Sequence, residues 1–385
     1  MWRHIASNFL TLLVVVVFLL GGMILWGQKE YGTTGPLDEA ICLRVDPGST
    51  MRRISRRLED EGAIVSGTIF RIGAEYSNKS DDLKAGSWLI PEGASMSQIT
   101  DIITRGGASS CGTEVVYRIG IAKAEVVVRE LDTGTGRYEE KIAFDPAVDE
   151  AAPELFTRVR GQADTRYRIA LAEGVTSWQV VEELKSVDVL EGAVAELPAE
   201  GSLAPDSYEV RAGDTRESVI ARMRAAQDII MAEAWQNRAA DLPLESAYEA
   251  LILASIIEKE TGVSEERRQV ASVFTNRLRR GMRLQTDPTV IYGVTKGQGI
   301  LGRGLRQSEL RGNTPWNTYV IDGLPPTPIA NPGRASIEAA VNPDETDYIF
   351  FVADGSGGHA FAQTLEEHNR NVAKWRQIEA ERTAN

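Results

Sequence analysis

The first pattern along the chain is an uncharged, strongly apolar run from Phe9 to Gly27. A helix of that length rises about 28 Å, close to the roughly 30 Å hydrocarbon core of a bilayer. A cleavable signal peptide has a shorter apolar run, followed by small residues, whereas this run continues through Trp26. The pattern therefore predicts a transmembrane helix over 9–27. Arg3 and His4 before it and Lys29 and Glu30 after it give a weak bias toward a cytoplasmic N-terminus over 1–8.

A second pattern recurs four times after this helix. Each copy starts with an apolar residue, has glycine fourth and Thr or Ser sixth, and has apolar residues tenth and fourteenth. The spacing predicts a strand, a glycine turn, and a helix whose apolar residues share one face. The Thr or Ser is expected to be the N-cap. The four copies are VDPGSTMRRISRRL (45–58), IPEGASMSQITDII (90–103), LAEGVTSWQVVEEL (171–184) and VRAGDTRESVIARM (210–223), with N-caps Thr50, Ser95, Thr176 and Thr215.

The remaining periodicity predicts an α+β protein of several domains. Runs such as Glu114–Ile119 and Ala124–Val128 predict an extra hairpin. The C-terminal part predicts a long helix over Tyr248–Thr261, a second helix capped by Ser264, a closing hairpin and a last helix from about Leu365. The glycine turn of the repeated units resembles the opening of LysM-type glycan-binding modules, although such units can also serve as scaffold only. We expect a LysM-like domain at 38–105, an inserted β-rich segment at 106–165, a second strand-helix region at 166–241 and a catalytic domain at 242–385.

Composition narrows the class of partner. The 385 residues carry a net charge of −13, which argues against nucleic acid because a phosphate-binding surface needs a basic excess. Only two cysteines occur, Cys42 and Cys111, so at most one intramolecular disulfide is possible, and we interpret them as structural thiols, free or paired. The chain has only three histidines and no metal-binding or phosphate-binding motif, so its sequence suggests neither a metal nor a cofactor. We interpret His359 and His368 as structural.

Two carboxylates in LILASIIEKETG (251–262) are the first candidates for chemistry. Glu258 and Glu260 lie about 200° apart around a helix, so they face different surroundings. Glu260 follows the stripe of Leu253, Ile256 and Ile257, and it sits at the negative end of the helix dipole. Both effects favour the protonated form that a general acid needs for glycosidic cleavage. For Glu258 we expect a salt bridge, with an arginine of the next helix as the partner, and we expect Lys259 to face solvent.

A common glycosidase needs a second carboxylate about 5–10 Å from the first. Asp287, in the loop of GMRLQTDPTVIYG (281–293), is the nearest candidate, although Asp before Pro is also a common turn element.

These segments resemble the YceG-like family of endolytic murein transglycosylases (MltG). The residues that carry the resemblance are LILASIIEKETG (251–262), RRQVASVFTNRLRRGMRLQTDPTVIYG (267–293), WNTYVIDGLPPTPIANPG (316–333) and YIFFVADGSGGHAF (348–361), with weaker likeness in LKAGSWLIPEGAS (83–95) and GSLAPDSY (201–208). Ala204 and Ser207 depart from the family pattern, and residues 104–165 form an insertion relative to it; these departures concern the N-terminal architecture and not the chemistry.

The resemblance implies a single-pass protein of the inner membrane whose periplasmic region cleaves nascent glycan strands and limits their length. It implies Glu260 as the essential acid, because the second Glu of E-K-E is essential in that family. It also implies cleavage between N-acetylmuramic acid and N-acetylglucosamine with a 1,6-anhydro end, and an association with peptidoglycan synthases. Polar residues at matching motif positions are expected to line the sugar cleft. They are Gln285, Thr286, Asp287, Tyr292, Asn317 and Tyr319, with Glu258 as a further substrate-binding candidate.

Two other functions remain open. A hydrolytic muramidase would need an activated water and a base, for which Asp287 or Glu258 are the candidates. A non-catalytic tether would hold glycan through the strand-helix units, with Glu260 as a structural acid.

Overall fold

The computed structural model describes residues 2–107, 109–149, 151–162 and 164–384. The described chain forms two compact units. Unit 1 comprises residues 1–115, 127–144 and 150–167, and unit 2 comprises 116–126, 145–149 and 168–385, apart from the residues outside the described ranges. The domain boundaries expected from sequence remain predictions.

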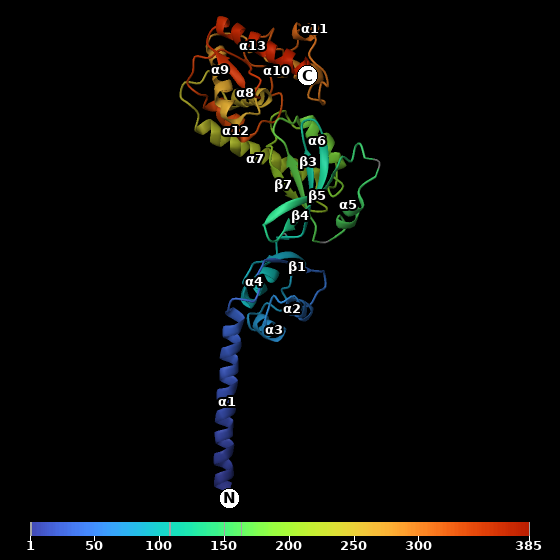
Figure 1. The fold of residues 1–385 in the computed structure, drawn as a ribbon, viewed down its shortest axis with the longest axis vertical. Coiled ribbons are helices and arrows are strands. Elements are labelled where there is room, and N and C mark those ends of the chain that lie inside the picture. Colours follow the sequence, from blue (N-terminus) through green and yellow to red (C-terminus); the bar gives the residue numbers. More distant parts are fainter. Residues whose placement is uncertain (1, 108, 150, 163, 385) are drawn as a thin grey trace. The chain divides into compact units, whose positions relative to one another are not determined.

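The N-terminal part of unit 1 is a long helix followed by a small α+β domain (Figure 1). Within the helix, Leu10–Gly32 is long and apolar enough to cross a membrane, with a mean hydropathy of 2.6. The two strands of the domain pair antiparallel, with Leu43 opposite Trp88, and Cys42 is disulfide-bonded to Cys111. The elements are α1 (Trp2–Gly32), β1 (Ile41–Val45), α2 (Met51–Asp60), α3 (Gly67–Tyr76), β2 (Gly86–Ile90) and α4 (Met96–Arg105).

All four strand-turn-helix units predicted from the sequence are present. Each glycine has a positive φ, which a side-chain-bearing residue rarely adopts, and each Thr or Ser accepts a hydrogen bond from a backbone N–H in the first turn of its helix. The glycines are Gly48, Gly93, Gly174 and Gly213, and the caps are Thr50, Ser95, Thr176 and Thr215. The units open helices α2, α4, α6 (Ser177–Ser186) and α7 (Arg216–Gln236).

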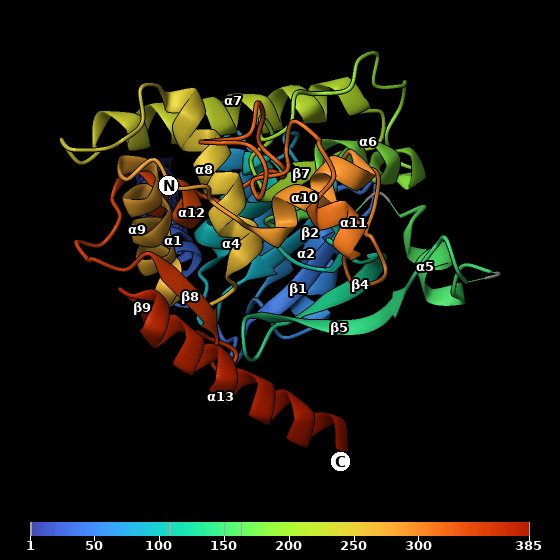
Figure 2. The ribbon, with the colours of Figure 1, turned by 90° about the horizontal axis from the view of Figure 1, so that it is seen from above.

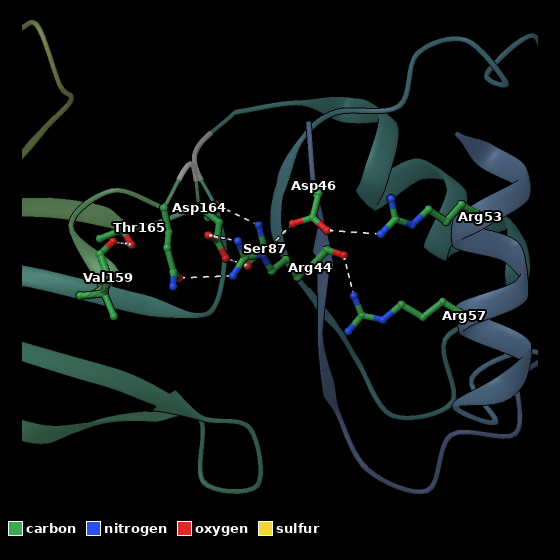
Figure 3. Close-up of polar contacts among 10 residues, drawn as sticks. Arg44, Asp46, Arg53, Arg57, Ser87, Val159, Asp164 and Thr165 are labelled. Carbon is green, nitrogen blue, oxygen red and sulfur yellow. Dashed lines mark hydrogen bonds and ion pairs between the residues drawn. The ribbon is translucent and has the colours of Figure 1, made fainter. Parts of the chain in front are cut away.

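A polar network within unit 1 joins the small domain to the segment before residue 166 (Figure 3). The Arg44 guanidinium donates to Asp46 at 2.9 Å and lies 3.6 Å from a carboxylate oxygen of Asp164. The Ser87 hydroxyl donates to the other oxygen of Asp164 at 2.6 Å. Since Arg44 is on β1 and Ser87 on β2, the network fixes both strands against the same carboxylate.

Five strands form the larger sheet, in the order β5-β4-β3-β6-β7. The two β-rich runs predicted between residues 104 and 165 are confirmed as strands β3 and β4. The strands are β3 (Thr113–Ile119), β4 (Ala124–Asp132), β5 (Arg137–Phe144), β6 (Arg166–Leu171) and β7 (Ser207–Val210), and the short helix α5 spans Glu154–Val159.

The helices of unit 2 pack around α8 (Ala247–Glu260), whose residues from Ala250 to Ile257 are all buried. It contacts α7, α9 (Arg267–Arg279), α10 (Asp287–Thr295) and α12 (Arg334–Val341), as Figure 2 shows. The second predicted helix is present, but Ser264–Glu266 is a 3-10 turn (η1) and the α-helix begins at Arg267. The rest of unit 2 comprises α11 (Gln307–Leu310), the antiparallel pair β8 (Phe350–Ala353) and β9 (His359–Ala362), and α13 (Leu365–Ala384).

Candidate active site

Glu260 is the last residue of α8. The helix ends there because Thr261 is extended, with φ −137° and ψ 131°, while its N–H still bonds to the carbonyl of Ile257. The residues one turn before it, Ile256 and Ile257, are completely buried, as the apolar stripe predicted. The Glu260 side chain is therefore anchored at the edge of the core and is itself half-buried.

The carboxyl of Glu260 is enclosed by polar groups from three other elements. Its Oε1 accepts a hydrogen bond from the hydroxyl of Thr286, the residue before α10. Burial raises the pKa of Glu260 and the charge of Asp287 raises it further, whereas the Thr286 hydrogen bond, His359 and Arg277 act in the opposite direction. Because burial is the largest of these effects, the protonated carboxyl is favoured to a higher pH than in an exposed Glu.

Thr286 is held by a small cluster of buried threonines. It is only 2% exposed, and its N–H donates to the hydroxyl of Thr318 at 3.0 Å. The Thr289 hydroxyl donates to the Thr286 carbonyl at 2.7 Å and lies 2.8 Å from the Thr318 hydroxyl. These bonds fix the Thr286 backbone, and its hydroxyl donates to Glu260 and does not cap α10. Sequence reasoning missed Thr289 and Thr318, although each is close in sequence to a motif residue that it named.

Asp287 and Tyr319 lie on the exposed side of this cluster. The Tyr319 hydroxyl donates to Asp287 Oδ1 at 2.7 Å, and burial together with this carboxylate raises the pKa of Tyr319. Gln285 is exposed and has a left-handed backbone with φ 50°, its N–H bonded to the Thr318 carbonyl. Gln285 and Asp287 are therefore exposed and Tyr319 is half-buried beside the Thr286 cluster, and the charge of Asp287 acts on Glu260.

Two cations near Glu260 were not predicted as part of the site. Arg277 is 7% exposed and donates to the carbonyls of Ile349 at 2.7 Å and Leu284 at 2.6 Å. His359 is held by Glu266, which accepts from its backbone N–H at 2.9 Å and lies 2.8 Å from its Nδ1. The ring of His359 is therefore held in place by a carboxylate from the turn before α9.

Tyr292 belongs to a different cluster, around Glu200. Its hydroxyl donates to Glu200 Oε2 at 3.1 Å, and the N–H of Ser177 donates to Oε1 at 2.8 Å. Burial raises the pKa of both Tyr292 and Glu200. Tyr292 therefore has no hydrogen bond to the Glu260 cluster among the described residues.

Three expectations from the sequence are wrong in detail. Glu258 forms no salt bridge within the described ranges, because its carboxylate accepts instead from the N–H of Gly333 at 2.9 Å. Lys259 does not face solvent, since its ammonium donates to the carbonyl of Gly174 at 3.2 Å and burial lowers its pKa. Asn317 is fully buried and its amide donates to the carbonyls of residues 309, 310 and 312, so its side chain closes the end of α11 and does not line a cleft.

A sequence profile of the YceG-like family matches residues 43–374, which is most of the chain. The chain belongs to the YceG-like family. All of the residues described around Glu260 fall inside the matched region.

Curated relatives of the family are similar over nearly the whole chain. A protein of Streptococcus pneumoniae serotype 2 named endolytic murein transglycosylase is 26% identical over 96% of this chain, which spans 65% of that relative's length. A protein of Bacillus subtilis with the same name is 28% identical over 93% of this chain and 91% of its own length. A crystal structure of a YceG-like protein from Listeria monocytogenes is 26% identical, covers 86% of this chain and superposes with a TM-score of 0.46.

Proposed function

We propose that this chain is a membrane-anchored lytic transglycosylase that cleaves peptidoglycan glycan strands internally, with Glu260 as its acid and base. The observation that carries the proposal is a carboxyl with a raised pKa that accepts a hydrogen bond from a buried, fixed hydroxyl. Such a group keeps its proton to a higher pH than an exposed Glu, and the hydroxyl stabilises the charge left after the proton is transferred. The names of the curated relatives agree with this chemistry.

In the first step, protonated Glu260 gives its proton to the oxygen between N-acetylmuramic acid and N-acetylglucosamine. The bond from that oxygen to the muramyl C1 breaks, its electron pair leaves with the oxygen, and C1 acquires oxocarbenium character. The Glu260 carboxylate formed in this step is stabilised by the hydroxyl of Thr286. The positive charges of Arg277 and of protonated His359 favour the same carboxylate.

In the second step, the muramyl C6 hydroxyl attacks C1 and gives its proton to the Glu260 carboxylate. The product is a 1,6-anhydro ring, no water is consumed, and Glu260 returns to its protonated form. A single carboxylate of the protein suffices, so a nucleophilic partner at a fixed separation is not required. Asp287 and Tyr319 are proposed to bind sugar hydroxyls at the exposed side of the site, together with Gln285.

The rival hydrolase would require a base that activates water. Glu258 is poorly placed for that role, because it lies about 200° around α8 from Glu260 and one of its oxygens already accepts from the Gly333 N–H. Asp287 remains the candidate, since it is exposed and its charge acts on Glu260. The two reactions differ in their products, because hydrolysis leaves a reducing end and takes up water, whereas the transglycosylase does neither.

The membrane topology is proposed from two features. α1 contains a span that can cross a bilayer, and the disulfide between Cys42 and Cys111 suits an oxidising compartment. We therefore place the N-terminus in the cytoplasm and the rest of the chain in the periplasm, anchored in the inner membrane. Glycan binding by the LysM-like units and association with peptidoglycan synthases are further parts of the proposal that rest on the family resemblance alone.

The test is product analysis with the full chain in detergent or nanodiscs and uncrosslinked glycan strands, in water enriched in ¹⁸O. We expect anhydro-muramyl ends from the wild type and from Glu249→Gln, a matched control at the other end of α8, and none from Glu260→Gln. Reducing ends carrying ¹⁸O would replace the proposal with the hydrolase. Anhydro ends from Glu260→Gln at the wild-type rate would remove Glu260 from the mechanism, and no product from the wild type would favour the tether.

A further inference from the structure

Helix α3 of unit 1 has apolar residues on two opposite sides. Phe70 and Ala74 are completely buried in the core of the small domain. Ile69, Ile72 and Tyr76, spaced by three and four residues, form a second stripe roughly on the other side of the helix, in which Ile69 is half-buried and also packs at the edge of the core. Ile72 is 63% exposed and Tyr76 is 79% exposed, and Val65 just before the helix is also exposed. Here the name "α3 stripe" means Ile69, Ile72 and Tyr76.

The α3 stripe lies next to the helix that is long enough to cross a membrane. Gly73 of α3 faces the ring of Tyr31 in α1 so closely that an added Cβ would lie 2.3 Å from a ring carbon. The Tyr31 hydroxyl also donates to Thr100 of α4 at 2.8 Å. Gly73 is adjacent in sequence to Ile72 and one turn from both ends of the stripe, so the stripe borders the surface that packs on α1. Figure 1 shows α3 beside the last turns of α1, as their contacts require.

The connection between α1 and the domain is also fixed by the backbone. The N–H of Gly35 donates to the carbonyl of Gly93 at 3.0 Å, and the N–H of Gly93 donates to the carbonyl of Leu37 at 2.9 Å. Leu37 is buried in the core of the domain. The domain is therefore held against the end of α1 without a loose linker, and its distance from the bilayer follows from the length of the helix.

That distance is short. Tyr31 lies four residues beyond Gly27, where the uncharged run ends, which is about 6 Å along a helix. The headgroup region of a bilayer is about 5–7 Å deep on each side of the hydrocarbon core. Tyr31 and the part of α3 that it contacts are therefore expected at headgroup depth, where tyrosine and tryptophan are enriched, and Trp26 lies one turn before this level.

We propose that α3 rests on the membrane that α1 spans, with the α3 stripe turned into the lipid headgroup region. The exposed apolar residues are then covered by lipid, and the small domain has two attachments to the membrane instead of one. Two cationic side chains, Lys29 and Arg71, could interact with the negatively charged phosphates of the lipid headgroups. Lys29 is exposed at the end of α1, and Arg71 of α3 donates to the hydroxyls of Ser55 and Thr68; neither forms an ion pair within the described part of the chain. This proposal is independent of the proposed reaction.

The experiment uses the full chain, one copy per nanodisc of phosphatidylethanolamine and phosphatidylglycerol, with one spin label. The label is attached to I72C or Y76C, or to the matched control E75C, an exposed position on the polar side of α3. The native cysteines are disulfide-bonded, so the added thiol takes the label. Accessibility is measured to oxygen, which concentrates in lipid, and to a nickel chelate, which stays in water.

We expect the labels on I72C and Y76C to be several-fold more accessible to oxygen relative to nickel than the label on E75C. A water-like ratio at I72C and Y76C, equal to that at E75C and with thermal unfolding unchanged from the wild type, would show that the stripe faces water and would overturn the proposal. Strong dipolar broadening at I72C in discs that hold two copies, together with a water-like ratio in discs that hold one, would show that a second chain covers the stripe and would also overturn it.

Discussion

Replacing Thr286 with valine tests the proposed acid–base role of Glu260 by removing the hydroxyl that donates to its carboxyl. Valine keeps the shape of threonine, so the change removes the hydroxyl that donates to Glu260 and leaves the buried volume filled. A hydrogen bond to a charged group contributes about 1.5–3 kcal/mol. If that contribution is made mainly when Glu260 becomes a carboxylate in the transition state, kcat falls about 10- to 150-fold, since each 1.36 kcal/mol is a factor of ten.

The pH dependence separates this effect from a loss of structure. The Thr286 hydrogen bond lowers the pKa of Glu260, so its removal raises that pKa further above the ordinary value. A general acid must be protonated, and activity is therefore lost as the pH rises through the Glu260 pKa. In Thr286→Val the alkaline limb of the kcat profile should move to higher pH while the plateau falls, and Thr286→Ser should restore both toward the wild type.

The assay is the rate of anhydro-muramyl end formation on uncrosslinked glycan strands, measured from about pH 5 to pH 9 for the three proteins. A fall in kcat without movement of the alkaline limb, accompanied by a lower unfolding temperature, would mean that Thr286 supports the loop and does not act on Glu260. An unchanged kcat and an unchanged profile would refute the assigned role of the hydroxyl altogether.

Other consequences can be tested separately. The folded pKa of Glu260 is raised, so its contribution to stability is complete below the unfolded pKa of about 4.3 and is lost as the pH rises through the folded pKa. Glu260→Gln should therefore raise the unfolding temperature, measured by calorimetry, at pH 8 but not at pH 4. Equal shifts of the unfolding temperature at both pH values would contradict this. Replacing Cys42 and Cys111 with alanine removes a disulfide between residues 69 apart in sequence, and it should lower the free energy of unfolding of unit 1 in urea by roughly 4 kcal/mol. A reductant should destabilise the wild type by a similar amount and should have no further effect on the double variant. His359→Ala should lower kcat by about tenfold and move the alkaline limb of the kcat profile to higher pH. Glu266→Gln, which removes the carboxylate that holds His359, should have the same effects to a smaller extent. Unchanged kcat profiles in both variants would exclude an electrostatic role for His359.

The repeated strand-turn-helix units were predictable because each is decided locally. A glycine that must adopt a positive φ and a hydroxyl that caps the next helix lie two residues apart, so Gly174 and Thr176 are recognisable in sequence without knowledge of the sheet. The helix that carries Glu260 was predictable for the same reason, since its apolar residues and its final glycine are contiguous. Its neighbours in space were not, because they come from three other elements.

The predictions that failed concern the direction of single side chains. Lys259 was expected in solvent, but its ammonium donates to the carbonyl of Gly174, which is far away in sequence. Asn317 was grouped with Tyr319 by its motif, yet its side chain is fully buried and its amide closes the end of α11. His359 and Glu266 are 93 residues apart, so no local pattern could pair them.

The structure also distinguishes Glu260 from the other enclosed carboxyl with a raised pKa in unit 2. Both oxygens of Glu200 are occupied, one by the N–H of Ser177 and the other by the hydroxyl of Tyr292, so that carboxyl is a structural acceptor between two parts of the unit. At Glu260 only Oε1 has a hydrogen-bond partner among the described residues, the hydroxyl of Thr286. In the proposed reaction, the second oxygen gives a proton to the substrate and takes one back. Burial raises the pKa of both groups, and it is the unoccupied oxygen that makes one of them suited to acid–base catalysis.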